Sequence, residues 1–440
     1  MSGFNRNQTP KTRPMPHKRT ALVASLDIGT SKIACMIARL KPCPPSDALR
    51  GRSHAVELIG YSQIQSRGLK AGAVVDLAEC EQAVRQAVAL AEDMAKVRVE
   101  SVLLSVSAGR LQGHLIEAAA NIRGGAVTAA DVARVTSAGM RHATGEGRTV
   151  LHALPVGYSI DGVKGIRDPK GMVARQFGVD MNVVTADATV ARNLMLVVER
   201  CHLNVEAMAA SPYVAGLAVL TDDEADLGAA VVEMGAGTTT IATYSGGRFV
   251  HASGFALGGH HITMDLARGL SACIADAERI KTLYGTVLTG GSDTRELMSV
   301  PSAGDDELDV PQIVSRATIA NIVRHRAEEI FEMARDRLAD SPFAAEPKAR
   351  VVLSGGASQL TGTLELATRV LNRPVRIGRP LGFSRLPNEA KGASFAVPTG
   401  LLVYPQYAHL EHVEPRHTRQ LRTGTDGYLG KVGRWLREGF

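Results

Sequence analysis

The strongest constraint on the fold is a strand–turn–strand motif that occurs twice, in widely separated parts of the chain. The first copy is LDIGTSKIACMIA (26–38) and the second is VEMGAGTTTIATY (232–244). Each copy has an apolar strand with one acidic residue near its end, then a turn of glycine with small or hydroxyl residues, then a second apolar strand. This repetition predicts a duplicated fold in which the two turns face each other.

The residues of these two turns suit phosphate binding. Glycine lets backbone N–H groups approach phosphate oxygens, and serine or threonine hydroxyls donate further hydrogen bonds. The acidic residues, Asp27 and Glu233, stand where each could hold Mg²⁺ through its water shell. One such hairpin alone would more often be an ordinary tight turn, so the prediction rests on the pair.

Two glycine pairs strengthen the interpretation. Gly258–Gly259 lies in ALGGHHITMDLA and Gly355–Gly356 lies in LSGGASQL, each before a predicted helix. A helix that begins at a glycine pair allows close approach to a phosphate or an adenine face, and its dipole favours negative charge. Four such elements in this order predict a nucleotide site.

The rest of the chain divides into segments of different character. Residues 101–180 have a predicted strand–helix–strand–strand order and form a candidate inserted domain. Residues 262–340 are mainly helical in pattern, with a polar loop near 301–311. The length of 440 residues predicts two to four domains, and 45% hydrophobic residues with 21% charged residues are typical of a globular α/β protein. Residues 1–20 are basic and contain proline, which predicts a disordered tail.

Disulfides and a transition-metal centre are not expected. Five cysteines are scattered without a C-x-x-C pair, which indicates a reducing compartment. His261 and Asp265 share a helix face, but no third ligand follows at motif spacing. No apolar run is long enough for a transmembrane helix.

The last residues have the pattern of a membrane-surface helix. Residues 428–440 follow a polar linker over 415–427 and include Trp435, the only tryptophan of the chain. On a helical wheel one side is apolar and the other is basic. The apolar side holds Tyr428, Leu429, Val432, Trp435, Leu436 and Phe440, and the basic side holds Lys431, Arg434 and Arg437. Docking on the protein's own body is the alternative, and nucleic acid is another partner for a basic segment in general.

The order of the four glycine elements resembles the phosphate-1, phosphate-2 and adenosine motifs of the superfamily that contains actin, heat-shock chaperones and sugar kinases. More narrowly, GIRDPKGM (165–172), VVERCHLNVEAMAAS (197–211), the inserted domain and the amphipathic tail resemble the bacterial cell-division family FtsA. The resemblance covers about residues 22–414 and the last 13 residues.

This resemblance implies an actin-like α/β fold of two lobes. An RNase H-like domain is duplicated, and each lobe is built on one copy of it. It assigns 21–100, 181–225 and 396–414 to subdomain 1A, and 101–180 to an inserted SHS2-like domain. It assigns 226–262 with 341–395 to subdomain 2A and 263–340 to subdomain 2B.

The resemblance also assigns nucleotide contacts. Asp27 and Glu233 would hold Mg²⁺ through water, and Glu278 with Lys281 would reach the ribose and adenine; from the residues alone that pair is more often a surface salt bridge. The remaining predicted contacts with ATP are Gly29, Thr30, Ser31, Lys32, Gly235, Gly237, Thr238, Thr239, Gly258, Gly259, Gly355 and Gly356.

The second turn departs from the superfamily pattern D-x-G-G-G-T-x-D. Glu233 replaces the first aspartate, Ala236 the middle glycine and Thr240 the second aspartate. Threonine is a poor general base. We therefore expect ATP binding with slow hydrolysis or none, and a scaffold rather than an enzyme.

The function implied by the resemblance is a polymer at the cytoplasmic face of the inner membrane, at the division site. It would tether the tubulin-like protein FtsZ there, help recruit later division proteins and bind no nucleic acid. Arg316, Arg324 and Arg326 on a predicted helix would receive the C-terminal peptide of FtsZ, although a solvated helix face fits them equally well. The alternatives are a small-molecule kinase, which needs a carboxylate base, and an actin-like type IV pilus assembly protein, which lacks such a tail.

Overall fold

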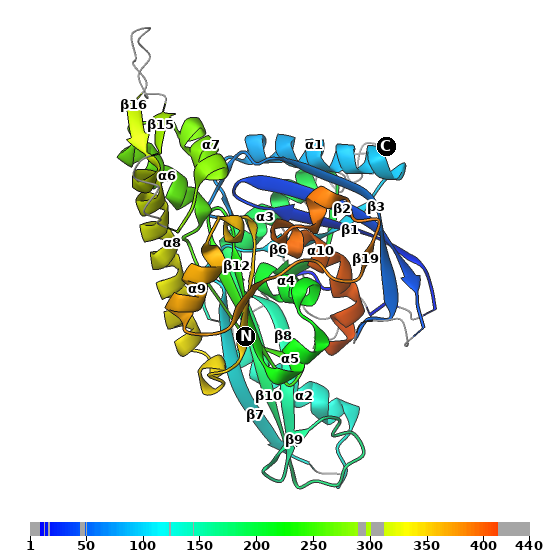
Figure 1. Ribbon diagram of the computed structural model, residues 1–440. Helices are drawn as coiled ribbons and strands as arrows, with labels where there is room; N and C mark the ends of the chain where they lie inside the picture. Colours follow the sequence, from blue (N-terminus) through cyan, green and yellow to red (C-terminus); the bar gives the residue numbers. More distant parts are fainter. Residues whose placement is uncertain are drawn as a thin grey trace, which may run out of the picture.

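Two β-sheets, each covered by helices, make up the body of the protein in a computed structural model (Figure 1). The structure describes residues 9–12, 14, 15, 18–44, 49, 51–122, 125–143, 145–288, 296–300 and 312–411, without the side chain of His142. The buried hydrophobic residues form three clusters, one in each lobe and one in the inserted domain.

The first lobe is built on a six-stranded sheet with the order β11-β6-β1-β2-β3-β19. β1 and β2 pair antiparallel along their whole length, as the first motif predicts. β6 pairs in parallel with both β1 and β11. In sheet order the strand bounds are Asn204–Ala210, Ser101–Val106, Ala21–Ile28, Lys32–Pro42, His54–Gln65 and Phe383–Ser384.

The second sheet has nine strands in the order β18-β17-β12-β13-β14-β7-β10-β8-β9. β12 and β13 form the hairpin that the second motif predicts. Strands β7 to β10 belong to the inserted domain, and β7 pairs with β14 of the second lobe at Ser253 opposite Gln112. In sheet order the bounds are Val375–Ile377, Arg350–Ser354, Ala229–Met234, Thr239–Ser245, Arg248–Phe255, Gln112–Asn121, Gln176–Asp187, Arg148–Ile160 and Val163–Ile166.

Helices α4 and α10 pack on each other between the two sheets, α10 against β1, β2 and β6, and α4 against β12 and β13. α1 and α3 cover the first lobe, α2 covers the inserted strands, and α6 to α9 lie on the second lobe (Figure 1). The helix bounds, from α1 to α10, are Leu77–Ala95, Ala129–Ala143, Ala188–Arg200, Ser211–Val219, Asp222–Leu227, Gly259–Gly269, Ile274–Tyr284, Arg316–Ala339, Thr363–Leu371 and Ala396–Val403.

The short elements complete the chain. A two-stranded ribbon, β15 with β16, stands at the start of α8, and β4 pairs with β5. The ribbon was not predicted within the mainly helical stretch 262–340. These strands are Leu297–Val300, Gln312–Ser315, Leu69–Lys70 and Ala73–Val74, and the 3-10 helices η1 to η5 are Pro342–Ala345, Gly356–Gln359, Asn388–Lys391, Ala393–Phe395 and Tyr404–Leu410.

The prediction that strand 101–106 opens the inserted domain is wrong. This strand, β6, lies inside the six-stranded sheet of the first lobe. Its sequence SVLLSV is almost entirely buried, as is usual for a parallel strand covered on both faces. The first strand of the inserted domain is β7 (QGHLIEAAAN), which is half exposed and was missed.

The prediction of a disordered tail over residues 1–20 is wrong for residues 9–12. Thr9 and Thr12 are buried, and the Thr9 N–H donates to the carbonyl of Val150 in β8. The Pro10 carbonyl accepts from the Met208 N–H of β11, which is the edge strand of the first sheet. A polar, proline-containing sequence can still be ordered when a sheet edge offers it backbone partners.

Candidate nucleotide-binding site

The two predicted turns have the same backbone geometry. In the first, the Gly29 N–H donates to the Lys32 carbonyl at 3.0 Å; in the second, the Gly235 N–H donates to the Thr238 carbonyl at 2.9 Å. An L-side chain in place of Gly237 would place its Cβ 2.5 Å from the Thr30 hydroxyl oxygen. The two turns therefore face each other closely across the gap between the lobes.

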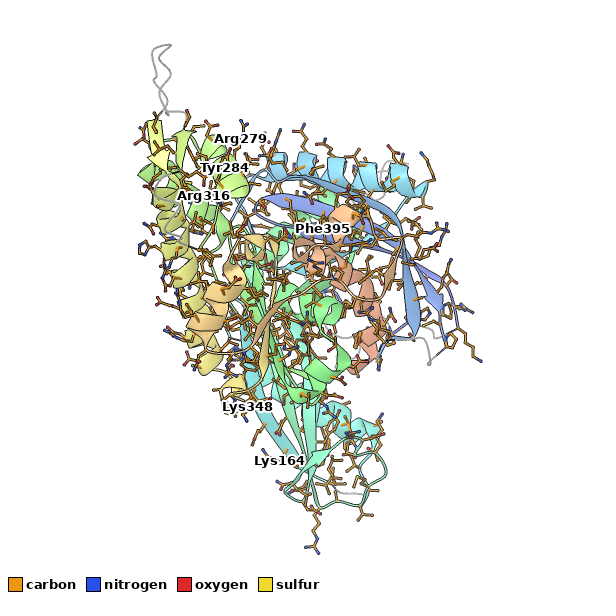
Figure 2. All side chains as sticks on the ribbon, in the orientation of Figure 1. Lys164, Arg279, Tyr284, Arg316, Lys348 and Phe395 are labelled. Atoms are coloured by element: carbon orange, nitrogen blue, oxygen red, sulfur yellow. The ribbon has the colours of Figure 1, made fainter. Side chains whose placement is uncertain are left out.

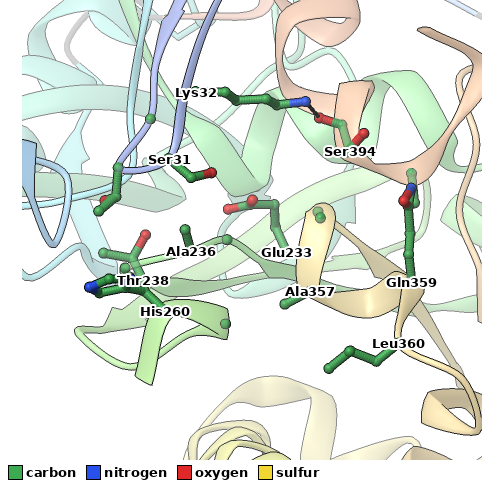
Figure 3. Close-up of a pocket in the computed structure, with 18 of the residues that line it drawn as sticks. Ser31, Lys32, Glu233, Ala236, Thr238, His260, Ala357, Gln359, Leu360 and Ser394 are labelled. Carbon is green, nitrogen blue, oxygen red and sulfur yellow. Dashed lines mark hydrogen bonds between the residues drawn. The ribbon is translucent and has the colours of Figure 1, made fainter. Parts of the chain in front are cut away.

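A cavity of about 450 Å³ lies between these turns. In Figure 3 the residues of the first turn face those of the second across it, and the Glu233 carboxylate points into the space. Fourteen of the sixteen predicted contact residues line the cavity. They are Asp27, Gly29, Thr30, Ser31, Lys32, Glu233, Gly235, Gly237, Thr238, Gly259, Glu278, Lys281, Gly355 and Gly356.

The other two predicted contacts, Thr239 and Gly258, are not among the lining residues. The buried Thr239 hydroxyl donates to the Leu257 carbonyl at 2.7 Å, so it braces the strand. Gly258 packs on the second turn, where a Cβ would come 2.5 Å from the Gly235 carbonyl oxygen. Thr239 and Gly258 therefore support the second turn and its strand without lining the cavity.

Helix α6 supports the second turn through its own first residues. The Gly259 N–H donates to the Gly235 carbonyl at 2.9 Å, and the His260 N–H donates to the Ala236 carbonyl at 2.7 Å. These N–H groups, which open a helix without intrahelical partners, are satisfied by the turn. Gly355 is similarly constrained, because it has φ +83° and lies against the Met234 backbone.

Several lining residues were missed by sequence reasoning. Ser211 begins α4, and Gln359 and Ser394 come from 3-10 helices that the sequence pattern did not predict. The others in this group are Gln63, Ser107, Thr282, Leu283, Gly285, Ala357, Leu360, Thr361, Ala393 and Val397, with Ala236 of the second turn. His260, which directly follows the predicted pair Gly258–Gly259, also lines the cavity. Most of them reach the cavity through tertiary packing, which leaves no local signal.

The two acidic residues share one electrostatic environment. Burial raises the pKa of Asp27 above its usual range, although the Ser105 hydroxyl donates to its carboxylate at 2.5 Å. Burial and the nearby Asp27 raise the pKa of Glu233 to about 7. The Thr240 hydroxyl donates to Glu233 at 3.0 Å. Two buried carboxyl groups with raised pKa values, one of them raised in part by the other, form a site that a cation would stabilise.

Lys32 also faces this cavity. Its ammonium donates to the Ser394 carbonyl at 2.7 Å (Figure 3) and lies 3.8 Å from the centre of the Phe395 ring. Burial lowers its pKa to about 8, against the opposing attraction of Asp27 and Glu233. Lys32 is therefore held by residues of η4, the 3-10 helix that directly precedes α10.

Glu278 and Lys281 lie together at the other end of the cavity. The Lys281 ammonium donates to Glu278 at 2.7 Å and to the Thr263 hydroxyl at 2.8 Å. Burial alone would raise the pKa of Glu278, but hydrogen bonds from Lys281 and Thr263 lower it. This ion pair is anchored on α6, unlike a purely exposed helix pair.

The donor set fits a magnesium nucleotide. The carboxylates of Asp27 and Glu233 suit the hard cation, and the glycine-rich turns suit its phosphates. Among the described residues no group of three or more histidine, cysteine or acidic side chains is arranged to hold a metal. Both carboxylate oxygens of Asp265 accept hydrogen bonds from Arg326.

The three predicted docking arginines all lie on α8 and all form ion pairs. Arg316 contacts Glu296 at 2.8 Å, and Arg326 contacts Asp265 and Glu329. Arg324 lies 3.9 Å from Glu328. Figure 2 places Arg316 at one end of the molecule and Lys164, on the inserted domain, at the opposite end.

The predicted linker and amphipathic helix, 415–440, lie outside the described residues. Within the described part of the chain, every helix is too short or too polar to cross a membrane.

Known proteins resemble both the sequence and the fold. The family model "Cell division protein FtsA" matches residues 230–400, and the model "SHS2 domain inserted in FTSA" matches residues 108–185. The chain is 47% identical to cell division protein FtsA of Agrobacterium fabrum over 98% of both chains. It is 30% identical to that of Escherichia coli over 95% of this chain and 98% of the relative.

Solved structures support the actin-like fold. The PilM–PilN type IV pilus biogenesis complex matches with a TM-score of 0.60 at 16% identity, over 87% of this chain and 98% of that chain. MreB5 of Spiroplasma citri bound to ADP matches with a TM-score of 0.51 at 13% identity, over 88% and 97%. These identities establish the fold alone, whereas the full-length relatives establish descent: the chain belongs to the FtsA family of cell-division proteins.

Proposed function

We propose that this protein binds ATP with Mg²⁺ between its lobes and acts as a membrane-attached scaffold for the division ring. The observation that carries the proposal is the pair of facing turns, in which Asp27 and Glu233 approach one cavity from different lobes. A ligand held by both turns would fix the lobes relative to each other, which is how a polymer subunit could be switched by its nucleotide.

In this proposal each part of the site has a separate task. Backbone N–H groups and hydroxyls of the turns hold the phosphates, and Asp27 with Glu233 orients the water shell of Mg²⁺. Lys32 moves from the Ser394 carbonyl to a phosphate oxygen, since an anion is a stronger partner than a carbonyl. Glu278 and Lys281 face the ribose and base.

Hydrolysis is slow in this proposal because the second turn lacks a water-orienting carboxylate. Thr240 stands opposite Glu233 in the hairpin and is fully buried. Its hydroxyl is occupied by Glu233 at 3.0 Å and lies 3.2 Å from the Ser211 hydroxyl oxygen. A hydroxyl in that position supports Glu233 and is a poor base toward an attacking water.

The partners proposed are those of the family: the C-terminal peptide of FtsZ, other copies of this chain in filaments, later division proteins and the anionic cytoplasmic face of the inner membrane. Arg316, Arg324 and Arg326 remain candidates for the FtsZ peptide, but an acidic peptide must compete with their internal ion pairs. Residues 428–440 would attach the filament to the membrane. Many weak anchors on one filament bind together through their high effective concentration.

Liposome co-sedimentation tests this membrane role. Full-length protein should pellet with anionic liposomes when Mg²⁺ and ATP are present, and Trp435→Glu should leave most of it in the supernatant because the apolar face is broken. ATP binding by this variant should equal wild type. Leu227→Glu, the same exchange type at an exposed residue of the folded body, is the control and should still pellet. Pelleting of Trp435→Glu at the wild-type level would contradict the proposal.

A further inference from the structure

The N-terminal residues 9–12, here called the strap, lie between β8 of the inserted domain and β11 of the first lobe. On one side Thr9 donates to Val150 of β8; on the other, the Thr12 hydroxyl donates to Glu206 of β11 at 2.6 Å. The Pro10 carbonyl accepts from the N–H of Met208, also in β11. The strap thus joins the edge of the first-lobe sheet to the inserted domain.

Lys11 places a charge beside β8 and the end of the segment 404–411. Its ammonium contacts the Glu411 carboxylate at 2.6 Å and also donates to the Leu151 carbonyl. The Glu411 side chain is only 2% exposed and that of Lys11 is 10% exposed. A buried carboxylate without a nearby cation is costly, so Lys11 is the counter-charge that makes the position of Glu411 tenable.

Glu411 is held by two further donors. The Ala210 N–H donates to His152 Nε2 at 2.8 Å, so the ring proton lies on Nδ1 and donates to Glu411 at 2.7 Å. The Tyr404 hydroxyl donates to the same carboxylate oxygen at 2.8 Å. Burial opposes ionisation, but Lys11 and His152 lower the pKa of Glu411 to about 2, in agreement with a charged carboxylate in this geometry.

Glu411 links the strap to the place where the C-terminal segment begins. Glu411 closes the segment 404–411, and residues 412–440, which include the amphipathic pattern, follow it directly. Its partner His152 in turn holds the backbone at Ala210, next to Ser211 of the nucleotide cavity. We propose that the strap is an intramolecular clamp, in which Lys11 docks on Glu411 and fixes the point from which the C-terminal segment leaves the body.

The clamp does not depend on nucleotide binding. Its occupant is the chain's own lysine-bearing segment, residues 9–12. Release of the strap would free the start of the C-terminal segment without disturbing the turns of the nucleotide site.

Hydrogen exchange on the full-length protein tests the clamp at a distance from the mutation. In Lys11→Met, backbone exchange of residues 404–411 and of Met208 should rise by about tenfold or more, because Glu411 loses its counter-charge and β11 loses its cover. Lys18→Met replaces an exposed lysine outside the strap and should leave exchange at the wild-type rate. Unchanged exchange of 404–411 in Lys11→Met would overturn the proposal.

A double variant separates the ion pair from general damage. Glu411→Gln alone leaves the buried Lys11 without its counter-charge and should also speed exchange. Lys11→Met with Glu411→Gln removes both charges, so its exchange should lie closer to wild type than that of either single variant. Additive effects of the two substitutions would mean that the pair does not hold the clamp.

Discussion

Glu233 is the cavity residue whose protonation most affects the binding of a cation. Its pKa of about 7 comes from burial first and from Asp27 second. Near neutral pH it is therefore partly protonated in the protein alone, and a bound cation would favour the charged form. The methylene that distinguishes it from aspartate lets its carboxylate reach the Thr240 hydroxyl at 3.0 Å.

This predicts a pH dependence of Mg²⁺–nucleotide binding. Below about pH 7 Glu233 is protonated and must release its proton to interact with the ion, so affinity should rise with pH between about 6 and 8. Glu233→Gln should bind more weakly and lose this rise. Calorimetric titrations at several pH values check it, and an equal pH slope in Glu233→Gln would contradict the assignment.

The raised pKa of Glu233 also changes how the free energy of unfolding depends on pH. A salt-bridged acid with a lowered pKa adds stability as pH rises, whereas Glu233 does the opposite. From about pH 4.5 to 7 the folded state keeps a proton that the unfolded state releases, so Glu233 lowers the free energy of unfolding as pH rises. At pH 8 Glu233→Gln should therefore be more stable than wild type without ligand, by up to a few kcal/mol. Denaturant unfolding at pH 5 and pH 8 measures the difference, which should be much smaller at pH 5.

At the scale of elements, the two hairpin turns must approach each other closely, and glycine makes this possible. At Gly237 a Cβ would lie 2.5 Å from the Thr30 hydroxyl oxygen and 2.8 Å from the Ala71 Cα. Ala71 has φ +49° in the short β4–β5 turn, so that turn has little room to yield.

Gly237→Ala should therefore separate the turns and weaken ATP binding by about tenfold or more, while the protein stays folded. The control is Gly145→Ala, since the nearest atom to its added Cβ, on the Arg148 side chain, is 3.7 Å away. Fluorescent-nucleotide titration with circular dichroism checks both variants. Wild-type affinity in Gly237→Ala would show that the turns do not act together.

The elements also show how far the sequence could predict this structure. The two hairpins and Gly258–Gly259 before α6 follow from local patterns of turn residues and apolar strands, whereas about half of the cavity lining does not. The assignment of β6 failed because parallel pairing is decided by distant strands. The order of residues 9–12 was missed because their backbone partners, Val150 and Met208, lie far away in sequence.

At the scale of the whole molecule, the cavity is where the two lobes meet. The first turn belongs to the six-stranded sheet and the second to the nine-stranded sheet, while α4 and α10 pack between them. The inserted domain continues the second sheet although its sequence interrupts the first lobe, and β7 meets β14 at the pair Gln112–Ser253. A relative movement of the lobes would therefore change the contacts between β7 and β14 and the contacts around the nucleotide.

The central claim is that one magnesium nucleotide is held by both lobes at once. Hydrogen exchange of the full-length protein, with and without Mg²⁺ and a non-hydrolysable ATP analogue, tests it most directly. The account predicts slower exchange at both turns, residues 28–32 and 234–238, and unchanged exchange at the distant loop around Gly162 of the inserted domain. Protection of one turn only, or of neither at saturating nucleotide, would contradict it.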